Sequence, residues 1–210
     1  MIEKKKNISM AVIKRLPKYH RYLQELINND VDRISSKELS EKIGFTASQI
    51  RQDLNCFGDF GQQGYGYNVK DLYNEIGVIL GLDKRYNTVI IGAGNIGQAI
   101  ANYTKFDKVG FELTGIFDAN PKMLGIKIRD VAIRDIDDLP KFLEVNKIDI
   151  AIICVPRISA QRVCDEVLRG GIKAIWNFAP VDLDVPEDVT VENVHLSESL
   201  YTLVYQLNDK

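Results

Sequence analysis

The stretch Gly92-Ala93-Gly94-Asn95-Ile96-Gly97 directly follows the short apolar run Asn87-Thr88-Val89-Ile90-Ile91. This is the spacing G-x-G-x-x-G at the turn from a strand into a helix. The first glycine permits the tight turn, the second lets a pyrophosphate approach the backbone, and the third lets the helix pack closely on the strand. The pyrophosphate then lies on the helix N-terminus, where N–H groups and the helix dipole favour an anion. The sequence therefore predicts a dinucleotide-binding Rossmann domain.

An acidic residue stands where the ribose ligand of such a site is expected. The apolar run from Phe111 to Phe117 ends in Asp118, which lies 21 residues after Gly97. A carboxylate at this position accepts hydrogen bonds from both ribose hydroxyls and repels a 2′-phosphate, which predicts NADH and NAD⁺ as cofactors rather than NADP(H). Lys122 follows shortly after Asp118 and makes that preference less absolute.

Further apolar runs of strand length alternate with amphipathic helices, which indicates an α/β fold with a doubly wound parallel sheet. Residues 148–155 and 174–178 are such runs, and a helix is expected at 159–169 between them. Ligands bind at the carboxyl ends of the strands in an open α/β sheet. An apolar lining from Tyr103, Phe106 and Phe178 would favour the neutral, reduced nicotinamide, because burial of an unpaired cation is costly. The predicted nucleotide-binding residues are Gly92, Ala93, Gly94, Asn95, Ile96, Gly97, Tyr103, Asp118, Lys122, Val155, Pro156, Asn177 and Phe178.

The first 82 residues have a different, helical pattern. Apolar residues fall at helical spacing from Val12 to Ile27, and Pro17 would tighten or break the early turns. Ser35-Ser36-Lys37-Glu38 and Thr46-Ala47-Ser48-Gln49 have the form of capping boxes, and a glycine ends the helix between them. Two short capped helices joined by a glycine turn are typical of a helix-turn-helix. An ordinary αα-hairpin with a solvated polar face is the alternative.

The second of these helices carries polar residues in its N-terminal half, the part of a recognition helix that reaches base edges in the major groove. Arg and Gln side chains there can make bidentate hydrogen bonds to guanine and adenine. Residues 57–69 are rich in glycine and aromatic residues, as in the β-hairpin of a winged helix. A hairpin that packs its aromatics on its own helices is the alternative. The predicted DNA contacts are Lys14, Arg15, Ser48, Gln49, Arg51, Gln52, Gln62, Gln63, Gly64 and Tyr65.

Charge is distributed unevenly along the chain, although the formal net charge is only −2. Residues 1–82 carry 12 basic and 10 acidic residues, whereas the rest of the chain carries 15 basic and 19 acidic residues. This polarity favours a polyanionic partner for the N-terminal part. The three cysteines have no metal-like spacing and suit a reducing compartment. With no signal peptide and no run long enough to cross a bilayer, we expect a cytoplasmic protein with no metal site and no membrane partner.

The end of the chain predicts one more amphipathic helix. Its apolar positions suit packing on its own domain or a contact between subunits. We therefore expect a winged-helix DNA-binding domain at 1–82, a Rossmann domain at 83–195 and a C-terminal dimerisation helix at 196–210. The apolar positions of the expected helix are Leu196, Leu200, Leu203, Val204 and Leu207.

Four stretches together resemble the Rex family of redox-sensing repressors: residues 11–17, residues 46–69, Gly92 to Tyr103, and 177–180 with 191–194. The match covers almost the whole chain. It implies a transcriptional repressor that binds operator DNA and is released when NADH binds, so that it responds to the NADH/NAD⁺ ratio. It also implies a homodimer whose C-terminal helix is swapped into the partner. Tyr103 and Arg15 would couple the cofactor site to the DNA-binding domain.

The chain departs from the family pattern at two places. Family members often carry an acidic residue where this chain has His195, which then is either a helix-start polar residue or a proton-sensitive part of the switch. Wing positions that are often basic are Gln62 and Gln63 here, which predicts fewer phosphate contacts and a weaker salt dependence.

A small NAD-dependent dehydrogenase is the main alternative. The Rossmann unit leaves no room for a substrate domain, and neither His20 nor His195 belongs to an acid/base constellation. We therefore expect no enzymatic activity and no catalytic residue. A CoA- or nucleotide-binding module is a second alternative, against which Asp118 argues because the ribose of CoA carries a 3′-phosphate. A structural dimer with an inert cofactor is the third. The effect of added NADH on DNA binding would distinguish them.

Overall fold

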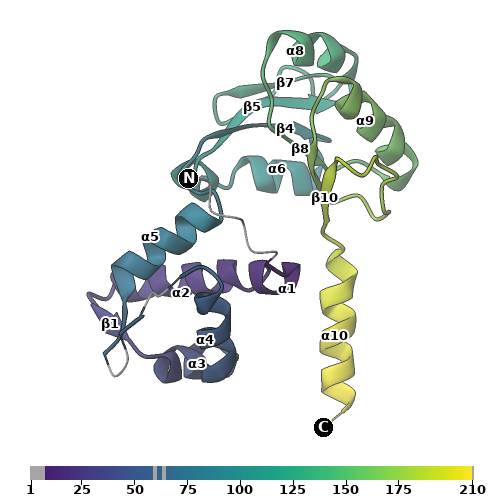
Figure 1. Ribbon diagram of the computed structural model, residues 1–210. Coiled ribbons are helices and arrows are strands. Elements are labelled where there is room, and N and C mark those ends of the chain that lie inside the picture. Colours follow the sequence, from purple (N-terminus) through teal and green to yellow (C-terminus); the bar gives the residue numbers. More distant parts are fainter. Residues whose placement is uncertain (1–7, 59–60, 63–64, 210) are drawn as a thin grey trace. The chain divides into compact units, whose positions relative to one another are not determined.

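The computed structural model describes residues 8–58, 61–62 and 65–209, and it divides the chain into two compact units, Met1–Lys84 and Arg85–Lys210 (Figure 1). Each unit has its own hydrophobic core. Within the described ranges, no helix is long and apolar enough to cross a membrane. The same ranges contain no group of three or more His, Cys, Asp or Glu side chains that could hold a metal ion.

The first unit is a small helical domain with a three-stranded antiparallel sheet. The expected N-terminal helix is split near Pro17 into α1 and α2, and α2 buries Leu16, Tyr19 and Leu23. The sheet has the strand order β1-β3-β2. The elements are α1 (Met10–Ile13), α2 (Leu16–Ile27), β1 (Arg33–Ile34), α3 (Ser36–Ile43), α4 (Ala47–Asn55), β2 (Gly61–Gln62), β3 (Gly66–Asn68) and α5 (Val69–Ile79).

The helix-turn-helix is built from α3 and α4. Ser35 forms the complete expected capping box with Glu38, and Gly44 ends α3 in the left-handed conformation at φ 72°. Thr46 accepts the hydrogen bond from the backbone N–H of Gln49. The second expected capping box is only half formed, because the Gln49 side chain donates to Asp53 instead. The two caps set the start of each helix and so fix the turn between them.

Strands β2 and β3 form the expected wing. Gln62 pairs with Gly66, and Tyr65 between them is 70% exposed. Gly66 has φ 70°, and a Cβ atom there would lie 2.6 Å from the carbonyl oxygen of Ile34, so the wing requires glycine at this point. Gln63 and Gly64 lie outside the described residues, as does the side chain of Gln62. Together with the helix-turn-helix, the described wing confirms the winged-helix prediction.

The second unit is a seven-stranded sheet with the order β10-β9-β8-β4-β5-β7-β6, parallel except for β6 (Figure 1). Strand β4 lies at the centre, and the chain crosses from β5 on one side of it to β8 on the other. This confirms the doubly wound prediction. The strands are β4 (Tyr86–Ile91), β5 (Phe111–Asp118), β6 (Lys127–Ile128), β7 (Val131–Asp135), β8 (Ile150–Ile153), β9 (Ala174–Asn177) and β10 (Thr190–Asn193).

Helices cover both faces of this sheet. On β4, Val89 and Ile91 point to one face, where α8 and α9 pack, and Ile90 points to the other, where α6 packs (Figure 1). Alternate side chains of a central strand are thus buried on opposite sides, which explains its continuous apolar run. The remaining elements are α6 (Asn95–Ala101), α7 (Lys105–Lys108), the short 3₁₀ helix η1 (Ile136–Asp138), α8 (Leu139–Val145), α9 (Arg157–Arg169) and α10 (Leu196–Asn208).

The C-terminal helix α10 is exposed along its whole length. Its large apolar residues are between 47% and 73% exposed. The helix α10 therefore does not pack on its own domain, and the first of the two expectations for this helix is wrong for the single chain. A helix with an uncovered apolar stripe needs another surface to bury it.

Candidate nucleotide site and nucleic-acid interface

The glycine loop between β4 and α6 is shaped by close backbone contacts. Gly92 has φ 99°, and a Cβ atom there would lie 2.5 Å from the carbonyl oxygen of Cys154, which directly follows the neighbouring strand β8. A Cβ atom on Gly97 would lie 1.9 Å from the carbonyl oxygen of Gly92. Gly94 differs, because a Cβ atom built there meets no atom of the described chain within 4 Å. Two glycines therefore allow the turn to form, and the one between them leaves space for a ligand.

Asp118 ends β5 beside this loop. Its Oδ2 accepts a hydrogen bond from the backbone N–H of Ala93 at 2.6 Å, and its Oδ1 accepts one from Asn120 at 2.7 Å. Each carboxylate oxygen has a further lone pair, so the group can hold the loop and still accept a hydrogen bond from a ligand hydroxyl. Lys122 is exposed, and its backbone N–H donates to Asn120 Oδ1.

A cavity of about 580 Å³ opens at the carboxyl ends of the central strands. Seven of the predicted nucleotide-binding residues line it: Gly92, Gly94, Ile96, Asp118, Val155, Pro156 and Phe178. Its other walls were not predicted, and they come largely from η1, α8 and α9. These additional lining residues include Ile136, Asp137, Leu139, Pro140, Ser159, Arg162 and Glu166.

The structure places the other predicted nucleotide-binding residues outside this lining. Asn95 and Tyr103 border an open apolar hollow on α6, which shares Ile96 and Phe178 with the cavity. Ala93 contributes its backbone N–H to Asp118, and Gly97 packs on the glycine turn. Lys122 lies in the loop after β5. The sequence pattern predicted these residues as one group, whereas the structure distributes them over the glycine loop, α6 with the residues after it, and the loop after β5.

Aromatic rings connect the α6 hollow to the end of β9. The rings of Tyr103 and Phe106 have centroids 4.7 Å apart, those of Phe106 and Trp176 are 5.7 Å apart, and those of Trp176 and Phe178 are 4.6 Å apart. Tyr103 is 46% exposed at the outer end of this chain of rings. Phe178, at the inner end, lines the cavity. The expected apolar lining thus reaches the cavity through Phe178.

Asn177 is fully buried beneath the cavity and does not line it. Its Nδ2 donates to the carbonyl of Val181 at 2.7 Å and to Asn193 Oδ1 at 2.8 Å. Asn193 in turn donates to Asp182 Oδ1, which lies 3.3 Å from His195 Nε2 at the start of α10. A run of polar contacts therefore joins the cavity-side end of β9 to the base of the C-terminal helix.

Two cysteines near the cavity are poor nucleophiles. Burial raises the pKa of Cys154 to about 12 and that of Cys164 to about 11. A thiol is reactive as its thiolate, so both side chains stay protonated and inert near neutral pH.

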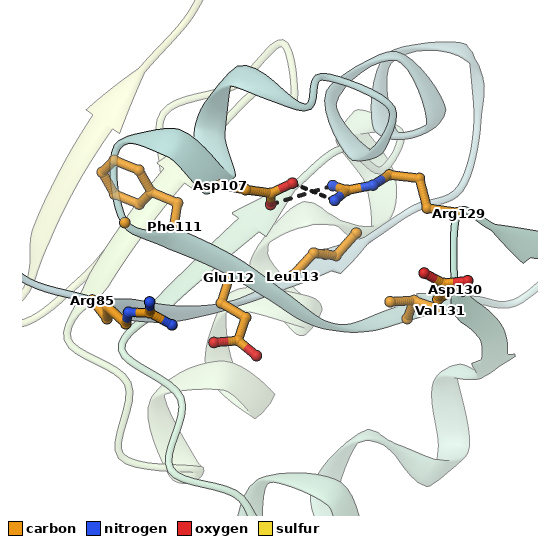
Figure 2. Close-up of a pocket in the computed structure, with 9 residues that line it drawn as sticks. Arg85, Asp107, Phe111, Glu112, Leu113, Arg129, Asp130 and Val131 are labelled. Atoms are coloured by element: carbon orange, nitrogen blue, oxygen red, sulfur yellow. Dashed lines mark hydrogen bonds and ion pairs between the residues drawn. The ribbon is translucent and has the colours of Figure 1, made fainter.

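A second cavity, of about 350 Å³, lies at the opposite edge of the sheet, at the amino ends of β4, β5 and β7 (Figure 2). Arg129 and Asp107 form an ion pair across it, while Arg85 and Glu112 line its other side. Dinucleotides bind at the carboxyl ends of parallel strands. This cavity is therefore separate from the glycine-loop site.

The predicted DNA-contacting residues of α4 differ in exposure. Ser48, Arg51 and Gln52 are exposed, and Gln49 is half-buried. Arg51 donates from Nη1 to Ser36 Oγ at 3.0 Å, which holds its side chain near the start of α3. Lys14, at the end of α1, is exposed. These residues, with Tyr65 of the wing, come from three separate elements of the first unit.

Arg15 has a partner inside the first unit that sequence reasoning missed. Asp53 of α4 is fully buried, and it accepts hydrogen bonds from Arg15 Nε at 2.6 Å and Nη2 at 2.7 Å. It also accepts from the Tyr19 hydroxyl at 2.6 Å and from Gln49 Nε2 at 2.9 Å. The helical spacing contained the signal, because Asp53 comes three residues after the inward residue Ile50 and so lies on the same face of the helix.

The ionisation of this cluster follows from its contacts. Burial opposes ionisation of the Asp53 carboxyl, but the hydrogen bonds from Arg15, Tyr19 and Gln49 outweigh it and hold the pKa of Asp53 below its ordinary value. The hydrogen bond to Asp53 raises the pKa of Arg15. Burial, followed by the bond to Asp53, raises the pKa of Tyr19. The cluster is therefore a charged pair with a neutral phenol at neutral pH.

Comparison with known families gives two matches, one to part of each structural unit. Residues 7–55 match a family described as "Putative DNA-binding protein N-terminus". Residues 83–181 match a family described as "CoA binding domain".

Relatives and solved structures match nearly the whole chain. A redox-sensing transcriptional repressor Rex from Clostridium perfringens (strain SM101 / Type A) is 76% identical over 207 residues, covering 99% of this chain and 98% of the relative. A crystal structure of RSP in complex with β-NAD⁺ and operator DNA is 66% identical with a TM-score of 0.91, covering 97% of this chain and 94% of RSP. A crystal structure of RSP in complex with β-NADH is 63% identical with a TM-score of 0.89, covering 97% of this chain and 96% of RSP.

Proposed function

The chain belongs to the Rex family of redox-sensing transcriptional repressors, and from that premise we propose that it binds operator DNA and leaves it when NADH binds. It would thereby repress transcription according to the NADH/NAD⁺ ratio. The observation that carries the proposal is the presence of two separate structures in one chain. One is the open glycine loop with Asp118 at its edge, and the other is a capped helix-turn-helix with an exposed polar face.

The residues around the glycine loop fit a dinucleotide. Gly94 leaves open space where a pyrophosphate approaches, and Asp118 has lone pairs available for ribose hydroxyls. Related RSP was crystallised with both β-NAD⁺ and β-NADH, which supports these two cofactors for this chain. A CoA module is less consistent with this site, since a carboxylate beside the ribose repels a phosphate. We propose that Gly92, Gly94, Asp118, Val155 and Phe178 contact the nucleotide.

Release by the reduced cofactor requires the protein to distinguish two similar ligands. A ligand shifts a conformational equilibrium only by its differential affinity for the two states. NADH and NAD⁺ differ by a hydride and one positive charge at the nicotinamide. Val155, Pro156 and Phe178 give the β8 and β9 side of the cavity an apolar wall. Such a wall favours the neutral ring, because an unpaired buried cation is costly.

We propose that the functional species is a homodimer. Two apolar surfaces of the second unit are exposed to solvent in the single chain. One is the apolar stripe of α10, and the other is the open hollow on α6, which Phe106 and Phe178 also line. A second copy of the chain can cover both by exchanging α10, as the family resemblance implies. A dimer would also place two recognition helices on a pair of half-sites.

NADH would act on this protein as a signal and not as a substrate. The relatives are named as transcriptional repressors, which supports the proposal that this protein is a regulator and not a dehydrogenase. We place its action in the cytoplasm, where operator DNA and the NADH pool meet. A regulator binds NADH reversibly, whereas an enzyme oxidises it in the presence of a substrate.

The test is a titration of fluorescently labelled promoter DNA with the full-length protein, followed by anisotropy with and without each nucleotide. We expect NADH to release the DNA and NAD⁺ to leave it bound. Arg51→Ala should abolish DNA binding without changing NADH affinity, because it removes a predicted base-reading side chain. Tyr103→Ala should weaken the NADH response while DNA binding persists. DNA affinity that stays the same at saturating NADH would overturn the proposal.

A further inference from the structure

We propose that Asp53 sets the base preference of the recognition helix by orienting the amide of Gln49. In this arrangement the carbonyl oxygen Oε1 of Gln49 faces the major groove. Gln49 then selects a base that donates a hydrogen bond, which is the amino group of adenine or cytosine. The inference rests on the proposed DNA binding and adds to it a specificity-determining residue that does not itself touch DNA.

The orientation of the Gln49 amide follows from the chemistry of its partner. Ionised Asp53 can only accept hydrogen bonds, so the group that faces it at 2.9 Å must be the NH₂ of Gln49 and not its oxygen. The low pKa of Asp53 keeps it ionised at neutral pH. The backbone N–H of Gln49 is held as well, by Thr46 Oγ1 at 3.1 Å. Gln49 is therefore anchored at both its backbone and its amide.

The carboxylate is in turn fixed by the neighbouring helix. Oδ2 of Asp53 receives Arg15 Nε and the Tyr19 hydroxyl, both at 2.6 Å, while Oδ1 receives Arg15 Nη2 and the amide of Gln49. Asp53 is fully buried, so water does not compete for these hydrogen bonds. With four donors on its two oxygens, the carboxylate cannot rotate without losing charge-assisted hydrogen bonds.

The oxygen and nitrogen of a carboxamide point in different directions from its carbon. Because the NH₂ of Gln49 is turned to the buried Asp53, we infer that Oε1 is directed to the half of α4 where Ser48 and Gln52 are exposed. In the major groove, adenine offers an N6 amino donor and cytosine an N4 amino donor. Guanine and thymine offer acceptors to a side chain at the corresponding positions. A fixed acceptor on Gln49 thus favours adenine or cytosine and disfavours guanine or thymine.

Replacing Asp53 by asparagine should weaken this preference. Asparagine offers one carbonyl oxygen where the carboxylate offers two, and Arg15, Tyr19 and Gln49 all donate to that carboxylate. Gln49 would then no longer face a group that can only accept, so its NH₂ could also turn to the groove. An outward donor prefers guanine or thymine, so the discrimination between the two pairs of bases should fall. A merely structural role of Asp53 would lower affinity for all sequences without moving this preference.

The test starts from an operator that the wild-type protein selects from randomised DNA. Each base pair of that operator is then substituted in turn, and Kd is measured for wild type, Gln49→Ala and Asp53→Asn. At one position we expect wild type to lose about tenfold in affinity when the exocyclic amino group is deleted, by purine for adenine or 2-pyrimidinone for cytosine. Gln49→Ala should show no such loss. Asp53→Asn should lose most of its discrimination against guanine and thymine at that position.

Tyr19→Phe is the matched control, because it removes one hydrogen bond from Oδ2 and leaves the Oδ1 side that faces Gln49 intact. It should keep the wild-type base preference. Should Asp53→Asn not fold, the amino-deletion experiment on wild type and Gln49→Ala still tests whether Gln49 presents an acceptor to the base, which the inference requires. An amino-deletion loss that is equal in wild type and Gln49→Ala overturns the inference, as does a folded Asp53→Asn with unchanged base preference. If wild type selects no operator at all, the proposed function fails instead.

Discussion

At the scale of single residues, the glycines of the loop have different roles, some in folding and one in ligand binding. A methyl group on Gly97 would lie 1.9 Å from the carbonyl oxygen of Gly92, whereas one on Gly94 would meet no described atom within 4 Å. We expect Gly94→Ala to keep the wild-type melting temperature and to lose at least about tenfold in NADH affinity, since the methyl group takes the space of the pyrophosphate. Gly97→Ala should lower stability by about 3 kcal/mol or more through overpacking.

Calorimetric titration with NADH and thermal unfolding of the free protein measure the two effects separately. Equal melting temperatures for Gly97→Ala and wild type would contradict the structural role of Gly97. An unchanged NADH affinity of Gly94→Ala would show that the ligand does not approach the loop there.

Asp118 gives a second prediction at this scale. Its carboxylate stands beside the loop and repels a phosphate on the ribose, so Asp118→Ala should weaken NADH binding by about tenfold while NADPH binding is unchanged or improved. The preference between the two nucleotides, measured by competition titration, should therefore collapse. Glu144→Ala is the control, because it removes an exposed carboxylate that does not line the cavity. An NADH/NADPH preference that survives in Asp118→Ala would exclude the carboxylate from nucleotide selection.

At the scale of elements, the packing of α2 on α5 should depend on pH through His20. Its ring stacks on Tyr73 with centroids 4.1 Å apart, and burial lowers the pKa of His20 below 6.5. The unfolded chain therefore binds a proton more readily than the folded one. The stability of this packing is complete above about pH 6.5 and falls as the pH drops toward the lower folded-state pKa.

The variant that isolates this effect is His20→Phe, which keeps an aromatic ring against Tyr73 but cannot be protonated. Amide hydrogen exchange in α2 and α5 reports the local opening free energy at each pH. Relative to the variant, wild type should open more easily at pH 5 than at pH 8. The same difference at both pH values would contradict the assignment.

Local signals predicted most of these elements. The capping pair Ser35 and Glu38, the αL glycine at Gly44 and the glycine loop each act over a few residues, so the sequence displays them directly. Residues 119–147 were not assigned, although η1 and α8 in this segment form a wall of the cavity. That wall exists only because β7 pairs beside β5, which is a contact between residues distant in the chain.

The Gln49 side chain shows the same limit within one helix. Its T-x-x-Q spacing predicted a bond back to Thr46, but the side chain turns to Asp53. The capping box would have the Gln49 oxygen accept from a backbone N–H, whereas the ionised Asp53 carboxylate accepts a charge-assisted hydrogen bond from the Gln49 NH₂. That carboxylate is in place because Arg15 and Tyr19 of another helix hold it there. Tertiary contacts therefore decided which of two local partners the amide took.

At the scale of the whole molecule, the apolar stripe of α10 should determine the oligomeric state. Leu200 and Leu203 are 56% and 59% exposed in the single chain, so the helix gains stability only by burial against another surface. We expect wild type to sediment as a dimer and Leu203→Glu to raise the dimer dissociation constant about 100-fold, because a buried unpaired carboxylate is costly. Gln206→Glu on the polar side of α10 adds the same charge and should leave the dimer intact.

Loss of the dimer should separate the two binding activities. A monomer presents one recognition helix, so Leu203→Glu should lose operator affinity steeply, since binding to two half-sites multiplies their contributions. NADH contacts in the proposed site come from the glycine loop and the ends of β5, β8 and β9 of one chain, so NADH affinity should fall far less. Analytical ultracentrifugation and the two binding titrations on the same samples make the comparison. A monomeric variant that holds the operator as tightly as wild type would show that α10 serves something other than DNA recognition by a dimer.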